Sequence, residues 1–446
     1  MTAEFLTGTH ESKLKRALGT PSLVLFGLVY MVPLTVFTTY GIVTETSGGR
    51  LPLAYLVTTV AMVFTALSYA RMAAAIPIAG SAYTYTQRTF GPPVGFVAGW
   101  SLLLDYLFLP MINYLVIGLY LNAALPGLPN WVIIVVAITV VTVLNIVGIV
   151  SVARTNFLII AVQAIFIVVF LVLALGQVAG SGTVSLLAPF TGDGSAAGMG
   201  PLLAGAAILC LSFLGFDAVS TLSEEAKDAK RSVPRAIMIA TIVSGAIFIT
   251  LSYVSHLVFP SHDFTDVDSG SLDVMVAAGG RFLDTFFTAA YVAGALGSAL
   301  TSQASVSRIL YAMGRDGILP RKVFGHISAR FSTPVYVILV VSVISLAAIV
   351  IDLGMLASLI SFGALVAFSA VNLSVIKHYF VDRGERNVVL NVILPGIGFS
   401  LTAWLWTSLS GQTLVFGLIW MAVGLLWLVV VTRGFRRPTP VLDLRE

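Results

Sequence analysis

Residues 21–44 read PSLVLFGLVYMVPLTVFTTYGIVT, an apolar run without a charged side chain. A helix that crosses the hydrocarbon core of a membrane needs about 20 such residues, so this run predicts a first membrane span. It is longer than the roughly 7–15-residue apolar core of a cleavable signal peptide, so we expect the span to be retained. Pro33 lies near its middle, removes a backbone donor and clashes with the preceding turn. The first span is therefore expected to be broken inside the membrane.

Similar apolar runs recur along all 446 residues and predict an all-α membrane protein with twelve spans. Charged residues make up only 10% of the chain and the mean hydropathy is +1.00, whereas a soluble protein carries roughly 25% charged residues. Lipid must therefore cover much of the surface. The expected spans are residues 21–44, 52–75, 93–122, 130–150, 153–176, 200–222, 234–258, 281–313, 334–352, 354–378, 388–408 and 412–432.

The basic residues predict the orientation of these spans. If the N-terminus is cytoplasmic, all but two of the 24 Lys and Arg residues fall on the cytoplasmic side, the exceptions being Arg50 and Arg281. This asymmetry follows the positive-inside rule and predicts cytoplasmic tails at 1–20 and 433–446. The net charge of +4 is thus a topology signal and does not indicate a nucleic-acid partner. The outer loop after the seventh span carries several Asp residues, which form either a solvated loop or a mouth that attracts cations.

The residues needed for several other functions are missing from the sequence. Cys210 is the only cysteine and the five histidines are scattered, so neither a disulfide nor a metal site is expected. The spans hold no HExxH or GxSxG motif and no His near a buried acid, which argues against a membrane enzyme. No cofactor is expected. A passive channel would need rings of like residues, for which the sequence gives no sign.

Two carboxylates lie deep in apolar spans, Asp105 in the third and Asp217 in the sixth. A charge at the bilayer centre costs at least about 2.5–3.5 kcal/mol on insertion scales, so such residues usually face a cavity and carry ions or substrate. The alternative is a structural hydrogen bond to a neighbouring helix. All Lys and Arg residues lie near span ends, so each acid must be protonated, hydrated or paired with a bound cation.

The sixth span contains a second weak point at Gly215, within SFLGFD at 212–217. Breaks in the first and sixth spans are the spacing expected of two inverted five-helix repeats with a binding site at the membrane midplane. The predicted units are therefore a first repeat at 21–176, a second repeat at 200–378 and two further helices at 388–432.

Four motifs resemble those of amino acid–polyamine–organocation (APC) transporters. They are PIAGSAYTY at 77–85, GFD at 215–217 followed by Glu224 and Glu225, SRILYAMGRDGILP at 307–320, and SFGALVAF at 361–368. The resemblance covers most of the chain in the right order. It implies the LeuT-type fold, with a 5+5 inverted repeat plus two C-terminal helices, and transport by alternating access.

Within this superfamily the chain looks most like the bacterial putrescine importers, on the strength of WSLLLDYLFLPMIN at 100–113. By resemblance, Tyr106 matches a tyrosine implicated in diamine recognition. The resemblance also implies the bacterial inner membrane, where the partners would be the lipid bilayer, a small amine and a proton. The expected substrate-binding residues are Tyr30, Thr35, Thr38, Asp105, Tyr106, Ser212, Phe216 and Asp217, and those for proton coupling or gating are Asp105, Asp217, Glu224 and Glu225.

Three departures from family patterns bear on the substrate and the coupling ion. Pro33-Leu34-Thr35 replaces the Gly-rich break that binds a carboxylate in amino acid members, which favours an amine. Thr38 stands where putrescine importers carry Asp, which leaves another amine or a neutral amino acid open. Gln163 occupies the place of a helix 5 lysine, so protons would move through Asp105, Asp217 or Glu224. The leading hypothesis is a proton-coupled importer of putrescine or a related amine, and the alternative is an amino acid permease or antiporter of the same fold.

Overall fold

The computed structural model describes residues 18–78, 80–147, 152–180, 185–192, 194, 198–315, 317–331 and 333–439, with the backbone alone over 152–158. Residues 1–17 of the predicted N-terminal tail and 440–446 of the C-terminal tail lie outside these residues. Within the described parts the chain is built from helices, and the only β-type pairing is an isolated bridge between Leu18 and Ala226.

Eleven helices in the described residues are long and apolar enough to cross a membrane. The expected ninth span is shorter, because α13 (Val335–Ser345) and the 3-10 turn η5 (Leu346–Ile349) together cover only Val335–Ile349. All twelve predicted runs are thus helical, but the count of twelve full-length spans is not reached. The long helical segments are α1 with η1 (Thr20–Phe37), α3 (Leu51–Ala75), α5 (Pro92–Ala124), α6 (Asn130–Val147), α7 (Val152–Gly180), α9 with η2 and η3 (Met199–Leu222), α10 (Ala229–Val258), α11 (Ser271–Arg315), α14 with η6 (Leu353–Asp382), η7 with α15 (Val389–Thr407) and α16 (Gly411–Val431).

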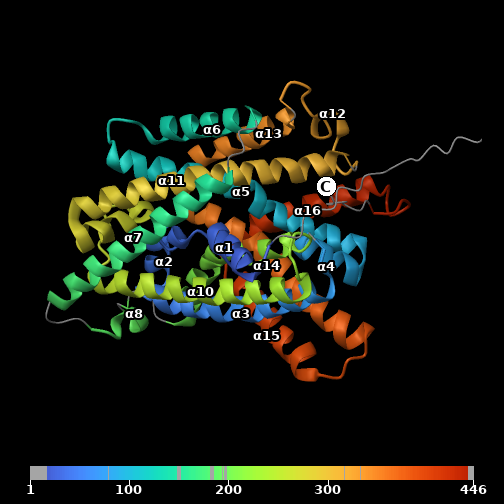
Figure 1. Cartoon of the computed structure of the whole chain (residues 1–446), viewed down its shortest axis with the longest axis horizontal. Helices are drawn as coiled ribbons and strands as arrows, with labels where there is room; N and C mark the ends of the chain where they lie inside the picture. Colours follow the sequence, from blue (N-terminus) through green and yellow to red (C-terminus); the bar gives the residue numbers. More distant parts are fainter. Residues whose placement is uncertain are drawn as a thin grey trace, which may run out of the picture.

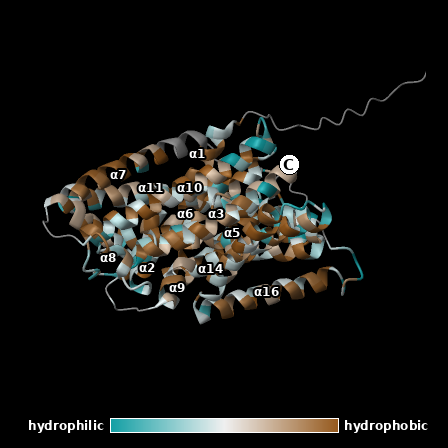
Figure 2. Ribbon diagram, turned by 90° about the horizontal axis from the view of Figure 1, so that it is seen from below, coloured by the Kyte–Doolittle hydropathy of each residue, from teal (hydrophilic) through white to brown (hydrophobic). Residues whose placement is uncertain are grey.

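The long helices run roughly side by side along the longest axis, with α10 packed on α3 and with α11 and α14 packed on α5 (Figure 1). The outer helices are made mostly of hydrophobic residues, as the hydropathy colouring in Figure 2 shows for α7 and α16. On α16 the exposed residues include Phe416, Ile419 and Leu426. This outward apolar surface is what lipid requires, because the hydrocarbon core offers no partner for polar groups.

The first span is broken at the expected place. Helix α1 ends at Met31, Val32 adopts a left-handed φ of 46°, and Pro33 opens the 3-10 turn η1 (Pro33–Phe37) before α2 (Tyr40–Thr46) begins. Proline cannot donate to the turn before it, so carbonyls at the end of α1 lose their helical partner. The Val29 carbonyl, to which residue 33 would donate in a regular helix, accepts from the Val32 amide at 3.3 Å. The Thr35 hydroxyl lies within hydrogen-bond distance of the Met31 and Val32 carbonyls, at 2.9 and 2.6 Å.

The sixth span is also broken, and the two breaks lie against each other. Helix α9 (Met199–Ile208) passes into η2 (Leu209–Phe213), Gly215 takes a φ of 134°, and η3 (Ala218–Leu222) follows Asp217. A Cβ added at Gly215 would lie 2.9 Å from the Met31 side chain and 3.0 Å from both the Met31 amide nitrogen and the Tyr30 ring. A glycine is needed here for both the dihedral and the close approach.

The fold is closed at both ends of this central region. At one end, the Leu18 amide donates to the Glu225 carbonyl at 3.0 Å, and the Lys227 amide donates to the Leu18 carbonyl at 2.9 Å. We call this pair of bonds the backbone latch. At the other end, the Tyr120 hydroxyl donates to the Phe37 carbonyl at 2.8 Å, and Gly41 packs so closely on the Val267 carbonyl that a Cβ would lie 2.2 Å from its oxygen. The broken helices are therefore tied to neighbouring segments at both ends.

A buried polar network joins α5, α6, α11 and α13 beside this region. The Gln303 side chain accepts from the Tyr114 hydroxyl at 3.2 Å and from the Asn145 amide at 3.0 Å, and it donates to the Ser342 hydroxyl at 2.7 Å. One side chain thus connects four helices, which favours their behaving as a single rigid body.

Replacing Gln303 by Leu is expected to lower the free energy of unfolding by about 2 kcal/mol, because interhelical hydrogen bonds in membranes average about 0.6 kcal/mol each and three are lost. Thermal unfolding of purified protein in detergent measures the change. Thr139→Val is the matched control, because the exposed Thr139 hydroxyl bonds only the Val135 carbonyl of its own helix. Equal melting temperatures for the two variants would contradict the role given to the network.

Candidate substrate-binding site

The two predicted acids, Asp105 on α5 and Asp217 between the halves of the sixth span, are both 5% exposed. Asp217 accepts from the Gly215 amide at 3.1 Å through Oδ1 and from the Ser81 hydroxyl at 3.4 Å through Oδ2. The glycine break therefore supplies the amide that holds this carboxyl in place. Both bonds are of the structural kind that the sequence offered as the alternative, and a role of Asp217 in carrying ions or substrate stays a prediction.

Asp105 is held differently. Its Oδ1 atom is buried and has no hydrogen-bond partner among the described residues. A buried carboxyl oxygen without a donor is costly, so it calls for a proton or a bound cation. The two carboxyls lie close enough to interact electrostatically with each other and with the hydroxyls of Tyr30 and Tyr106. The structure thus brings four of the predicted substrate-binding residues together.

Two contiguous cavities lie on one side of this group, and Tyr30, Val32 and Leu109 line both. The smaller one, about 50 Å³, also has Thr35 and Thr38 in its wall. The Thr38 hydroxyl is bonded to the hydroxyl of Tyr291 on α11, and Asn113 donates to Ser298 at 3.0 Å. The wall at this end is therefore polar but uncharged.

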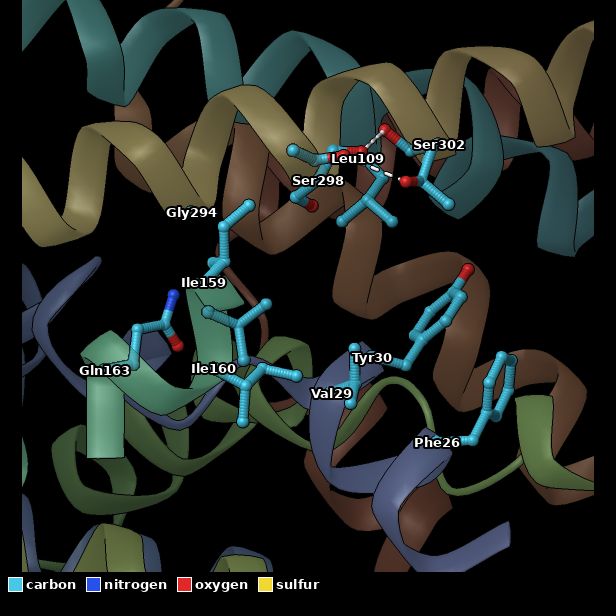
Figure 3. A pocket seen from close by; sticks show the side chains of 13 residues that line it. Phe26, Val29, Tyr30, Leu109, Ile159, Ile160, Gln163, Gly294, Ser298 and Ser302 are labelled. Atoms are coloured by element: carbon cyan, nitrogen blue, oxygen red, sulfur yellow. Dashed lines mark hydrogen bonds between the residues drawn. The ribbon is translucent and has the colours of Figure 1, made fainter. Parts of the chain in front are cut away.

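The larger of the two cavities, about 110 Å³, lies between α1, α7 and α11 (Figure 3). Gln163 on α7 is 2% exposed, and its Oε1 has no hydrogen-bond partner among the described residues. Its amide nitrogen packs so closely on Gly294 that a Cβ there would lie 2.3 Å away. A neutral amide therefore lies in the cavity wall at the place where the family pattern has a lysine.

A third cavity of about 230 Å³ lies on the other side of the acids, and Tyr106 and Ser81 are among its lining residues. Leu102 and Leu103 also line it, so it reaches the stretch of α5 that carries Asp105. The stretch of α5 around Asp105 therefore contributes to both groups of cavities, through Leu109 on one and Leu102, Leu103 and Tyr106 on the other, although neither carboxyl is itself a lining residue.

Of the predicted residues, only Tyr30, Thr35, Thr38 and Tyr106 line these cavities. Phe216 is fully buried, with its ring 5.4 Å from that of Tyr69 and 5.1 Å from that of Phe368. Ser212 bonds the Tyr55 hydroxyl at 3.0 Å. Glu224 and Glu225 lie after η3, where the Glu225 carbonyl takes part in the backbone latch. Substrate contact by Phe216 and Ser212, and gating by the two glutamates, stay predictions.

Tyr291, Asn113 and Ser298 were not among the predicted site residues. All three are polar side chains inside apolar runs, and that is the signal by which they could have been found. Single hydroxyls and amides are common in membrane helices, where they often bond a carbonyl of their own helix, so the pattern does not single out those that face a cavity.

The acidic outer loop is held by its own hydrogen bonds. Asp266 and Asp273 accept from the backbone amides of Asp268 and Thr265 at 3.1 and 2.9 Å. Asp352, which precedes α14, accepts from the Met355 amide at 2.7 Å. Partial burial, together with the carboxylates of Asp266 and Asp352, raises the pKa of Asp268 above its ordinary value. These contacts fit a structured loop, and among the described residues no group of three or more His, Cys, Asp or Glu side chains is placed to hold a metal.

A broken-helix membrane fold with a buried acid pair between cavities defines a solute transporter. In agreement, residues 20–434 match the model of the amino acid permease family. The chain therefore belongs to this family, whose members are transporters and not enzymes, and the resemblance to APC transporters is confirmed.

Among similar proteins is the low-affinity putrescine importer PlaP of Escherichia coli, which is 40% identical over 97% of both chains. The branched-chain amino acid permease BcaP of Bacillus subtilis is 28% identical over 93% of this chain and 92% of its own. The methylthioribose transporter of the same organism is 28% identical over 95% of both chains.

Proposed function

We propose that this protein imports putrescine or a closely related small amine by proton symport with alternating access, across a bacterial inner membrane and with both termini in the cytoplasm. The observation that carries the proposal is the buried acid pair, in which Asp105 Oδ1 lacks a donor. The 40% identity to a putrescine importer over nearly the whole chain supports the same substrate.

The chemistry of the site favours a ligand with ammonium groups and no carboxylate. An ammonium group supplies up to three hydrogen-bond donors, which the Asp105 and Asp217 carboxylates accept. The Tyr30 and Tyr106 rings lie beside the acids and add attraction for a cation. One ammonium group of putrescine would neutralise Asp217, which leaves Asp105 for the coupling proton.

A substrate carboxylate would find little to bind. Pro33 has no backbone N–H to donate, and the Gly215 N–H at the second break already donates to Asp217. The described residues that line the three cavities include no Lys or Arg. An amino acid would therefore bring an uncompensated anion close to two carboxylates, at a cost in free energy.

The same acids suit proton coupling. An empty site with two neighbouring carboxylates in a low-dielectric interior favours binding of a proton. An arriving ammonium group favours the charged form of the acid that it contacts, so a proton on one acid and an ammonium group on the other can be bound together, as symport requires. We assign the proton to Asp105, because its free oxygen needs a donor, and the main ammonium contact to Asp217.

A neutral amino acid remains the second candidate, because the cavity wall formed by Thr38, Tyr291 and Asn113 is uncharged and the branched-chain permease is a relative. Displacement of bound, labelled putrescine by unlabelled amines or amino acids distinguishes the two candidate substrates. Excess putrescine or cadaverine is expected to displace labelled putrescine, while leucine and alanine leave it bound. The reverse order would favour the amino acid function.

Uptake into proteoliposomes tests the proposal directly. Labelled putrescine is expected to accumulate when the outside is made acidic, to stop on addition of a protonophore, and to be indifferent to sodium. Uptake that requires sodium in the absence of a pH gradient would overturn proton symport. Folded protein that takes up no putrescine would overturn the substrate.

A further inference from the structure

The 230 Å³ cavity forms a chamber of its own, on the side of the acids that faces the backbone latch. It lies between the start of α4 (Ser81–Phe90), the first half of α5, η3 and the end of α11. These elements end in the stretches that the positive-inside pattern places in the cytoplasm. We call this chamber the aromatic vestibule.

The walls of the aromatic vestibule have a distinctive chemistry. Four of its twelve lining residues are aromatic, namely Tyr83, Phe96, Trp100 and Tyr106, and none is charged. The Trp100 and Trp420 rings stack at 5.1 Å, and each indole nitrogen donates to the other residue's carbonyl at 2.9 Å. The wall formed by Trp100 is therefore rigidly placed.

The aromatic vestibule is connected to the acid pair through two of its lining residues. The Ser81 hydroxyl donates to Asp217 Oδ2 at 3.4 Å, and the Tyr106 hydroxyl interacts electrostatically with both carboxyls. A ligand that leaves the acids toward the latch therefore meets aromatic rings with two carboxylates behind it.

We propose that the aromatic vestibule is a second binding site for the amine substrate, which holds an ammonium group against aromatic rings before release into the cytoplasm. Ring faces attract a desolvated cation by up to about 2 kcal/mol or more, and the nearby acids exclude anions. This inference rests on the proposed function and adds a second site to it. While the backbone latch is formed, the amine would stay bound in the aromatic vestibule. Breaking the two Leu18 bonds would open the vestibule to the cytoplasm.

The lone cysteine allows a clean test, because Cys210 is buried and can be replaced by Ala to give a thiol-free background. In that background Thr221→Cys places a thiol in the vestibule wall. Ser305→Cys on α11 is the matched control, a half-buried hydroxyl residue that is not part of this wall. Purified protein is treated with aminobutyl methanethiosulfonate, a cation, or with its neutral butyl analogue, and labelling is followed by mass spectrometry.

The ratio of the labelling rate by the cationic reagent to that by the neutral reagent is expected to be at least tenfold higher at position 221 than at position 305. Putrescine should slow labelling at 221 by a similar factor, and 1,4-butanediol should not. Preference for the neutral reagent would show an apolar pocket for a lipid chain or another hydrophobic ligand, and would overturn the proposal. So would labelling that putrescine does not slow, in protein that still transports it.

A filling variant gives an independent readout. Ile309→Trp occupies the vestibule from α11 without touching the acids. Putrescine binding is expected to stay within about threefold of the unmodified protein, while the uptake rate falls tenfold or more. Unchanged uptake by folded Ile309→Trp protein would overturn the second site and leave the proposed function intact. If the unmodified protein itself neither bound nor took up putrescine, the proposed function would be refuted.

Discussion

Replacing Asp217 by Asn is expected to reduce putrescine uptake by about 100-fold or more. The amide keeps the shape of the carboxyl but removes its charge, so the substrate ammonium is left buried without its counter-ion. Removing one partner of a buried charge pair costs roughly 2–5 kcal/mol, and about 1.4 kcal/mol is a factor of ten. Initial uptake rates in proteoliposomes, with protein amounts matched, measure the loss.

The control for this substitution is Asp352→Asn. Asp352 caps α14 by accepting from the Met355 amide at 2.7 Å, and Asn caps a helix equally well. Its uptake should stay within twofold of the unmodified protein. Asp105→Asn should also lose gradient-driven uptake, while exchange of labelled for unlabelled putrescine at equal pH should survive better than in Asp217→Asn. Equal exchange in the two variants would contradict the separate roles given to the acids.

Gly215→Ala is the second substitution with a large expected effect. The backbone there has a φ of 134°, and the new methyl group would lie 2.9–3.0 Å from atoms of Met31 and Tyr30. Strained backbone of this kind costs of order 1–3 kcal/mol, and a shift of the break also moves the amide that holds Asp217. We expect uptake to fall at least tenfold and the melting temperature to drop.

Gly176→Ala in α7 is the matched control, because a Cβ at that position meets no atom within 4 Å. The substitution should leave both uptake and melting temperature unchanged or slightly raise the latter, since alanine favours a helix. A Gly215→Ala protein that transports normally would show that the break tolerates a side chain, and the close approach of the two broken helices would then not be required for function.

Hydropathy alone predicted the helical runs, because the free energy of placing charged and polar groups in lipid is approximately a sum over the residues of each run. The position of the first break followed from the missing donor of Pro33, a local property of one residue. The ninth run shows the limit of this reasoning. Its apolar length predicts a full span, yet the chain turns through η5 before α14, and the Asp352 cap fixes that turn.

The sequence by itself determined that this chain is a polytopic helical membrane protein with two buried acids and two broken spans, because each of these is a property of a single segment. Only the tertiary structure decided that Asp105 and Asp217 lie within electrostatic reach of each other, that Thr38 is bonded to Tyr291, and that Gly215 lies against Met31. These contacts join residues far apart in the chain. They depend on how the helices pack, and packing is set by the shapes of many side chains at once.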